Sequence, residues 1–95
     1  VRKGYRTTPK SQRELEIKSA FTAASEWVAA AMKDLSAITS NQMKFRESLS
    51  TGKEIKGVSA KSYLSTRNWM SAVAIKIKLE GDPLPSNHQL PDFDA

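Results

Sequence analysis

Apolar residues recur at alternating spacings of four and three between residues 17 and 35, which is the period of one face of an α-helix. The stripe consists of Ile17, Phe21, Ala24, Val28, Ala31 and Leu35, and it is widened by Ala20, Trp27 and Ala30. Upstream, Ser11 and Glu14 fit the capping box, in which two side chains satisfy backbone donors at a helix start. The pattern predicts a long first helix, ending near Leu35, whose stripe is the central packing seam. If the Phe21 ring is buried in that seam, Phe21→Ala should cost roughly 3–5 kcal/mol.

A second helix start follows soon after the first helix. Thr39 and Gln42 fit another capping box, and Gly52 is a typical helix terminator. These signals predict a short second helix between them. Two glycines within residues 52–58 then predict a loop or a small hairpin.

Ser59 can cap a third helix, which we expect to end before Gly81. Residues 74–80 alternate between apolar and polar side chains, which also fits a strand, but the preceding segment is helical and no turn signal separates the two. We therefore favour the helix. Trp27 and Trp69, at the mid-points of the first and third helices, are expected to be core or interface aromatics. The apolar face of the third helix consists of Tyr63, Met70, Val73 and Ile77.

Together these elements predict an all-α fold: a small three-helix domain (long, short, long) over residues 11–81, with an extended arm at each end. The N-terminal arm, residues 1–10, is basic, with Arg2, Lys3, Arg6 and Lys10 and no acid. The C-terminal tail, residues 82–95, is acidic, and its prolines hold it extended. Two interpretations of the arms stay open. In the first, both arms are simply frayed, as chain ends often are. In the second, the tail docks on a neighbouring subunit through the anchors Leu84, Leu90 and Phe93.

Composition limits what such a chain can do alone. The 95 residues are 39% apolar and contain no cysteine, so the core is small and without disulfides. We expect a neighbour or a second copy to complete it. No apolar run is long enough to span a membrane, and no apolar stretch follows the charged N-terminus as in a signal peptide.

The residues that carry chemistry are sparse. His88 is the single histidine, and it lies in the proline-rich tail, away from any nucleophile or acid positioned by a helix. No clustered metal ligands and no glycine-rich phosphate motif are present. The sequence therefore predicts a protein that is not an enzyme and has no cofactor and no small-molecule substrate.

Nucleic acid is the alternative partner. Arg2, Lys3, Arg6 and Lys10 could contact phosphates or an acidic partner from the N-terminal arm. Acidic residues interrupt any basic face on the predicted helices, which argues against a sequence-specific reader.

One further pattern joins these elements. A Thr-Pro-Lys-Ser arm precedes a helix with phenylalanine and tryptophan, a short second helix follows, and Ser-x-Lys-Ser-Tyr-Leu opens a third. Over about residues 8–80 this order resembles small helical modules encoded in bacteriophage and prophage structural gene clusters. The second helix departs from their pattern, with Phe45 where a tryptophan is expected. The positions that carry the resemblance are Pro9, Gln12, Phe21, Ala24, Trp27 and the segment 58–64.

The resemblance implies a structural or assembly role in the virion, as a head, connector or decoration component present in many copies. Its partners would be other virion proteins or copies of itself, and its location the phage particle or otherwise the bacterial cytoplasm. The resemblance transfers no functional residue. A basic nucleic-acid-binding module remains the main alternative, and a helical interaction or regulatory module with a protein partner is a third.

Overall fold

Three helices and one short hairpin make up residues 12–94, the part of the chain that the computed structural model describes. The all-α, three-helix fold is thereby confirmed. The N-terminal arm and the Ser11 cap lie outside the described residues. The elements are α1 (Gln12–Ala31), α2 (Leu35–Thr51), β1 (Glu54–Ile55), β2 (Val58–Ser59), a 3-10 turn (Ala60–Ser62) and α3 (Thr66–Leu79).

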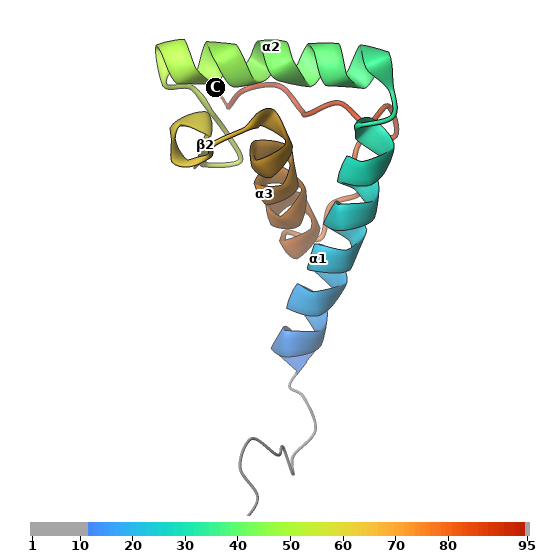
Figure 1. Cartoon of the computed structure of the whole chain (residues 1–95). Coiled ribbons are helices and arrows are strands. Elements are labelled where there is room, and N and C mark those ends of the chain that lie inside the picture. The colour runs from blue at the N-terminus through green and yellow to red at the C-terminus, as the bar shows by residue number, and fades with distance from the viewer. Residues whose placement is uncertain (1–11, 95) are drawn as a thin grey trace, which may run out of the picture.

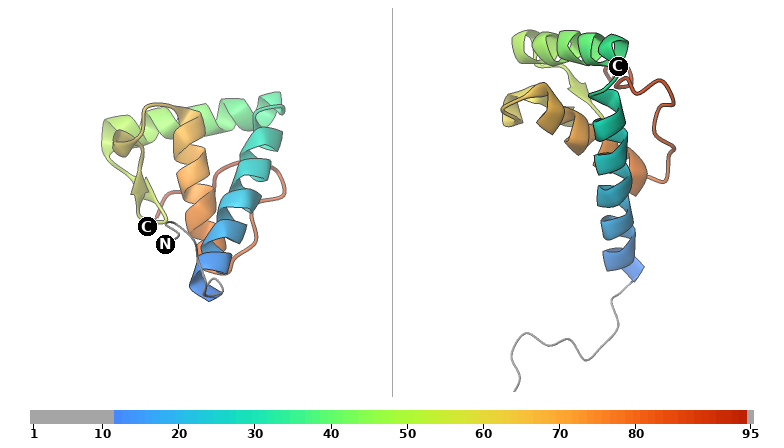
Figure 2. Two further views of the ribbon diagram at one scale, coloured as in Figure 1. Left: turned by 60° about the horizontal axis from the view of Figure 1, so that its bottom comes forward. Right: turned by 45° about the vertical axis from the view of Figure 1, so that its right-hand side comes forward.

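Helices α1 and α3 pack side by side, and α2 lies across one end of the pair (Figure 1). The hairpin lies near the far end of α2, and the C-terminal segment, residues 82–94, runs back under α2 (Figure 2). All of these elements lie on one side of α2, so its opposite side is uncovered in these views.

The boundary between the first two helices differs from the prediction. Helix α1 ends at Ala31, and Asp34 caps α2, where its carboxylate accepts hydrogen bonds from the backbone N–H groups of Ser36 (3.0 Å) and Ala37 (3.4 Å). Aspartate is among the best N-cap residues, so the helix starts here and the predicted capping box at Thr39 lies in its interior. With 17 residues, α2 is longer than the 14-residue α3, so the predicted long, short, long order is wrong.

The end of α2 and the hairpin follow the prediction. Gly52 terminates α2 in the left-handed conformation (φ 79°). The strands of the hairpin pair antiparallel through the two-residue turn Lys56–Gly57, in which both φ angles are positive (52° and 76°). Such turns match the twist of paired strands and favour glycine at the second position.

The third helix starts later than predicted. Ser59 caps the 3-10 turn instead, and Ser65 caps α3 by accepting a hydrogen bond from the backbone of Asn68. The helix continues to Leu79, which confirms the helical interpretation of the alternating segment through that residue.

The core lies between α1, α3 and the inner side of α2. Trp69 and Met70 are fully buried there and Trp27 nearly so, which confirms their expected place in the core. The remaining buried apolar members are Ala20, Ala24, Val28, Ala31, Ala37, Ile55, Ala60, Val73, Ala74, Ile77 and Leu90.

The predicted seam of α1 is correct only in its middle. Ala24 and Val28 are buried and Ile17 is half-buried, but Phe21 is 54% exposed and Leu35 is 78% exposed. The buried face of α1 is centred on alanines and Trp27, and Phe21 lies at its edge. Leu35 belongs to the next helix, after the chain has turned, so it cannot continue the stripe.

Candidate functional site

The C-terminal segment is attached to the chain's own helices. Leu90 is only 2% exposed within the core, while Leu84 and Phe93 are half-buried against the core. The prediction that these three anchors dock on a neighbouring subunit is therefore wrong for this structure. The physical reason is that α1, α2 and the hairpin leave an apolar surface that the tail itself is long enough to cover.

Side chains of α1 and α2 hold the tail mainly by its backbone. The indole Nε1 of Trp27 donates to the carbonyl of Pro85 at 2.8 Å. The fully buried amide of Asn41 donates from Nδ2 to the carbonyl of His88 (3.1 Å), and its Oδ1 accepts from the backbone N–H of Leu90 (2.7 Å). Because these contacts satisfy buried backbone groups, they fix the path of a segment that has no regular secondary structure.

Lys44 continues this row along α2. Its Nζ donates to the carbonyls of Leu90 (2.8 Å) and Pro91 (3.1 Å), and it lies 3.4 Å from a carboxylate oxygen of Asp92. The cation is thereby engaged by the protein's own tail.

The last residues of the tail are attached to the hairpin. The carboxylate of Asp94 accepts hydrogen bonds from the turn N–H groups of Lys56 (3.1 Å) and Gly57 (3.0 Å), and its own N–H donates to the carbonyl of Glu54 (2.9 Å). The ring of Phe93 stacks on the buried Trp69 at a centroid distance of 6.3 Å. The tail therefore helps to bury the largest side chain of the core.

Two buried polar residues of α2, one that fixes the tail and one that fixes the hairpin, were not predicted from the sequence. Asn41 and Ser48 are fully buried on the inner face of α2. The Ser48 hydroxyl donates to the carbonyl of Lys53 (2.5 Å) and accepts from the N–H of Ala60 (3.1 Å). Their spacing of four and eleven residues from the buried Ala37 places all three on one helical face, and this spacing was the available signal.

The remaining candidate groups among residues 12–94 are His88 and the charged residues around Lys56. The ring of His88 lies 6.4 Å from that of Trp27, and no group of three or more histidine or carboxylate residues in this range could hold a metal ion. Lys56 lies 3.2 Å from Glu80 and 3.6 Å from Asp82. The hydrogen bond to Glu80, the charge of Glu80 and the contacts with Asp82 raise the pKa of Lys56 above its ordinary value. These ion pairs join the hairpin turn to the end of α3 and to the start of the tail.

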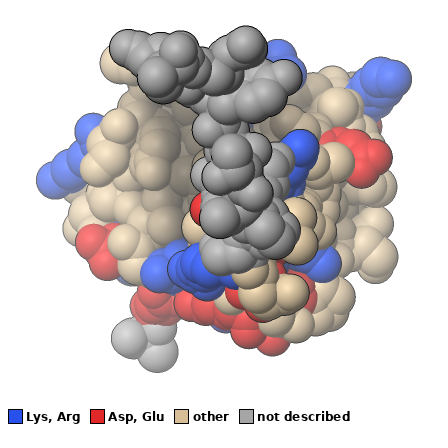
Figure 3. Space-filling view, turned by 90° about the horizontal axis from the view of Figure 1, so that it is seen from below, with Lys and Arg blue, Asp and Glu red and all other residues tan. Residues whose placement is uncertain are grey.

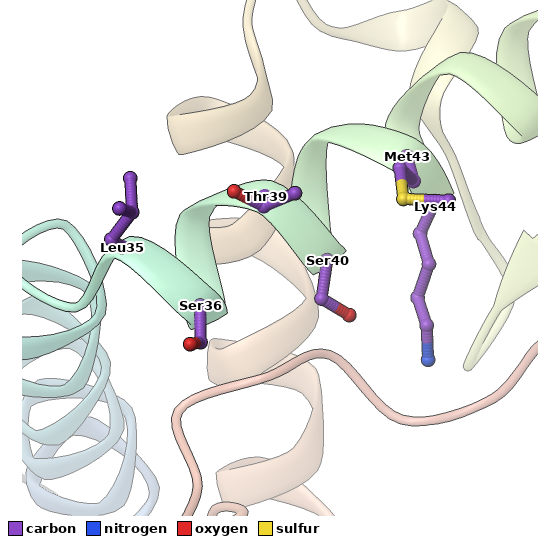
Figure 4. A pocket seen from close by; sticks show the side chains of 6 residues that line it. All are labelled: Leu35, Ser36, Thr39, Ser40, Met43 and Lys44. Carbon is purple, nitrogen blue, oxygen red and sulfur yellow. The ribbon is translucent and has the colours of Figure 1, made fainter.

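The surface on the outer side of α2 is the most distinctive candidate site. It is a shallow hollow of about 550 Å³, lined by residues of α2 alone. Leu35 and Met43 are 78% and 65% exposed there. In Figure 4, Leu35 points away from the rest of the chain, and Lys44 points toward the C-terminal segment. The residues that line the hollow are Leu35, Ser36, Thr39, Ser40, Met43 and Lys44.

Other large apolar side chains are exposed outside this hollow. Leu64, just before α3, is 96% exposed, beside a second hollow that includes Tyr63 and Ile75. The remaining exposed large apolar residues among those described are Leu15, Phe21, Met32 and Leu49.

Positive charge is unevenly distributed along the chain. Residues 1–10 hold four cations and no acid, whereas residues 12–94 hold the remaining 11 cations and all 10 acids. On the face in Figure 3, blue and red side chains lie next to one another. Because cations and acids nearly balance in residues 12–94, the helical body contributes little to a basic surface. The candidate phosphate contacts Arg2, Lys3, Arg6 and Lys10 lie outside the described residues.

Comparisons of the chain with family models, with curated proteins and with solved structures find no match. Within residues 12–94, no helix combines the length and the apolar character needed to cross a membrane.

Proposed function

We propose that this chain is a non-enzymatic structural or assembly protein that packs with copies of itself or with other proteins. The observation that carries the proposal is the set of exposed large apolar side chains, above all Leu35 and Met43 on α2 and Leu64 before α3. In a chain whose own core is small, apolar surface left in water is a common mark of protein–protein contact.

The docked tail supports a building block of fixed shape. Its contacts with Trp27, Asn41 and the hairpin turn join the end of the chain to α1, α2 and the hairpin. A subunit of fixed shape loses less conformational entropy on association than one whose segments must first become ordered.

The particle to which we assign this role is a bacteriophage virion. This part of the proposal rests on the resemblance of residues 8–80 to modules of phage structural gene clusters. A head, connector or decoration component would be repeated many times, so weak contacts between subunits would suffice.

Nucleic-acid binding is the second candidate, and the concentration of uncompensated cations in residues 1–10 favours it. Phosphate contacts weaken steeply with salt, whereas apolar contacts do not.

The native mass of the full chain in solution, measured by light scattering with and without duplex DNA over a range of salt, separates the two functions. The assembly role predicts masses above that of one chain that persist at high salt. DNA binding predicts a complex that dissociates with salt. Deleting residues 1–10 should then reduce the slope of log K against log salt by up to about four. A chain that stays monomeric and binds DNA through residues 1–10 would contradict the assembly role.

A further inference from the structure

The tail, residues 82–94, leaves the helical body at a point where α3 is already complete. The N–H of Gly81 donates to the carbonyl of Lys78 (3.0 Å), and the N–H of Asp82 donates to the carbonyl of Ile77 (3.1 Å). With Gly81 in the left-handed conformation (φ 87°), these two bonds form the Schellman motif that closes a helix. Because the helix end is satisfied before the tail begins, α3 does not depend on the rest of the tail.

The core of the body also lies almost entirely within the helices and the hairpin. Among residues 12–94, Leu90 is the only fully buried apolar residue that the tail contributes. All other buried apolar residues belong to α1, α2, α3, the hairpin or the 3-10 turn, with Val28 and Val73 as examples on α1 and α3. The body therefore keeps most of its core when the tail is detached.

The tail shares no ladder of backbone hydrogen bonds with the body. Beyond the hinge at Gly81, the only backbone–backbone bond between tail and body among the described residues runs from the N–H of Asp94 to the carbonyl of Glu54 (2.9 Å). The other bonds involve side chains, such as those of Trp27 and Asn41. Such groups recover hydrogen bonds with water when the tail leaves, which lowers the cost of opening. Segments held in this way are the ones that open locally in native proteins.

One buried side chain sets the alignment of the tail. Asn41 is fully buried, and both polar ends of its amide bind tail backbone, the carbonyl of His88 (3.1 Å) and the N–H of Leu90 (2.7 Å). A slip of the tail by one residue would leave this amide without partners in a buried site, which is costly. The groove under the tail therefore accepts an extended segment in one register.

We propose that the tail is a strap, which detaches from the body as one unit about a hinge at Gly81 while the three helices stay folded, and which rebinds in one register. The closed form, in which the tail runs along the inner side of α2 to the hairpin, is the major state (Figure 1). Opening uncovers the groove around Asn41 and the side of Trp69 on which Phe93 stacks. The strap goes beyond the assembly role, because it gives a subunit two states that expose different surfaces.

Native-state hydrogen exchange of the full chain measures the opening directly. The amides of Leu90 and Asp94 are bonded in the closed strap, to a side chain of α2 and to the hairpin. If the tail leaves as one unit, both amides should show the same protection, at least about 10-fold below that of Val73 in the interior of α3. Protection of Leu90 equal to that of Val73 would overturn the strap, because the tail would then leave only on global unfolding. A difference of more than about 10-fold between Leu90 and Asp94 would overturn it too, since the two parts would open separately.

A peptide added in trans tests the groove. A fluorescein-labelled synthetic peptide of residues 82–94 is titrated into the full-length wild type and into the full-length double variant Phe93→Ala/Asp94→Ala, whose own strap is weakened at its end. An apparent dissociation constant rises as the open fraction falls, so the double variant should bind the peptide with a constant about 10-fold or more below that of the wild type. Ser86→Ala, at an exposed position of the tail, is the matched control and should bind as the wild type does. Adding Asn41→Leu to the double variant should remove the binding.

Far-UV circular dichroism of the double variant shows whether the body needs the tail. Retained helix content together with tighter peptide binding supports the strap. A folded double variant that binds the peptide no better than the wild type would overturn it, because the groove would then not recognise the tail. Loss of helix content would overturn it as well, because the tail would then be part of the folded body. None of these outcomes depends on the native mass of the wild-type chain, so the assembly role is tested separately.

Discussion

The side-chain oxygen of Asn41 accepts a 2.7 Å hydrogen bond from the backbone N–H of Leu90, and both residues are buried. The two residues are 49 positions apart, in the middle of a helix and near the end of the chain. Through this contact and the bond from the Asn41 amide nitrogen to the carbonyl of His88, one side chain satisfies the backbone on both sides of Gln89.

Asn41→Leu should therefore destabilise the protein by about 2–3 kcal/mol, although leucine is the better helix former. The substitution leaves a buried N–H and a carbonyl without partners, and each such group costs about 1–3 kcal/mol. Urea denaturation gives the free energy of unfolding, with Gln42→Leu at the neighbouring exposed position as control. A cost below about 0.5 kcal/mol for Asn41→Leu would mean that the tail is not held in this way.

Phe93→Ala should loosen the end of the tail without unfolding the helices. The ring is half-buried and stacks on Trp69, so we expect a cost of about 1–2 kcal/mol. Limited proteolysis should cut the variant within residues 82–94 sooner than the wild type. Ser86→Ala, at an exposed position of the same segment, serves as control. Equal rates of cutting in all three proteins would show that the stacking contributes nothing.

Phe21→Ala and Met70→Ala should differ strongly in cost. Phe21 is half-exposed at the edge of α1, so truncation should cost less than about 1 kcal/mol, well below the sequence-based value for a buried ring. Met70 is fully buried, so its truncation should cost about 2–5 kcal/mol. The measurement is again the free energy of unfolding in urea. If Phe21→Ala cost more free energy of unfolding than Met70→Ala, Phe21 would have to be a core residue.

The ion pairs of Lys56 should make stability depend on pH in the alkaline range. The hydrogen bond to Glu80, the charge of Glu80 and the contacts with Asp82 raise the pKa of Lys56 above its ordinary value of 10.5. A raised pKa means that the folded state holds the proton more tightly than the unfolded state, so this contribution is fully present below pH 10.5. It is lost as the pH rises through the folded-state pKa.

Lys56→Met removes this contribution at every pH. Thermal melts of wild type and variant should therefore show a constant difference in Tm up to about pH 10 and a shrinking difference above it. Arg46→Met, which removes a cation without an ion pair among the described residues, controls for the change in net charge. A Tm difference that stays constant through pH 11.5 would contradict the assignment.

The sequence alone determined which segments become helices and where sharp turns fall. Apolar periodicity identified the helical segments, Gly52 marked the end of α2, and the two glycines near residues 52–58 indicated the hairpin. These features depend on interactions within a few residues, such as backbone hydrogen bonds of one turn or the positive φ that glycine accepts. Trp27 and Trp69 could also be assigned to the core, because the exposure of such large side chains is costly wherever they lie in the chain.

Competition between local signals was harder to resolve. Asp34 and Thr39 are both good caps, and the structure uses the earlier one, where the Asp34 carboxylate accepts hydrogen bonds from the N–H groups of Ser36 and Ala37. The burial of Phe21 was misjudged because periodicity defines a stripe about 100° wide, whereas α3 covers only part of it.

The tail shows most clearly what only the tertiary structure decided. Its prolines and apolar anchors predicted an extended docking segment, but nothing local states which surface it docks on. The partners of Pro85, Leu90 and Asp94 lie 37 to 58 residues away in the chain, on α1, α2 and the hairpin turn. Those groups come together only after the helices have packed, so a polar Asn41 in the middle of a helix carries no local sign of its role. Leu35 and Met43 on the outer side of α2 follow the same rule, because only the assembled fold leaves them exposed.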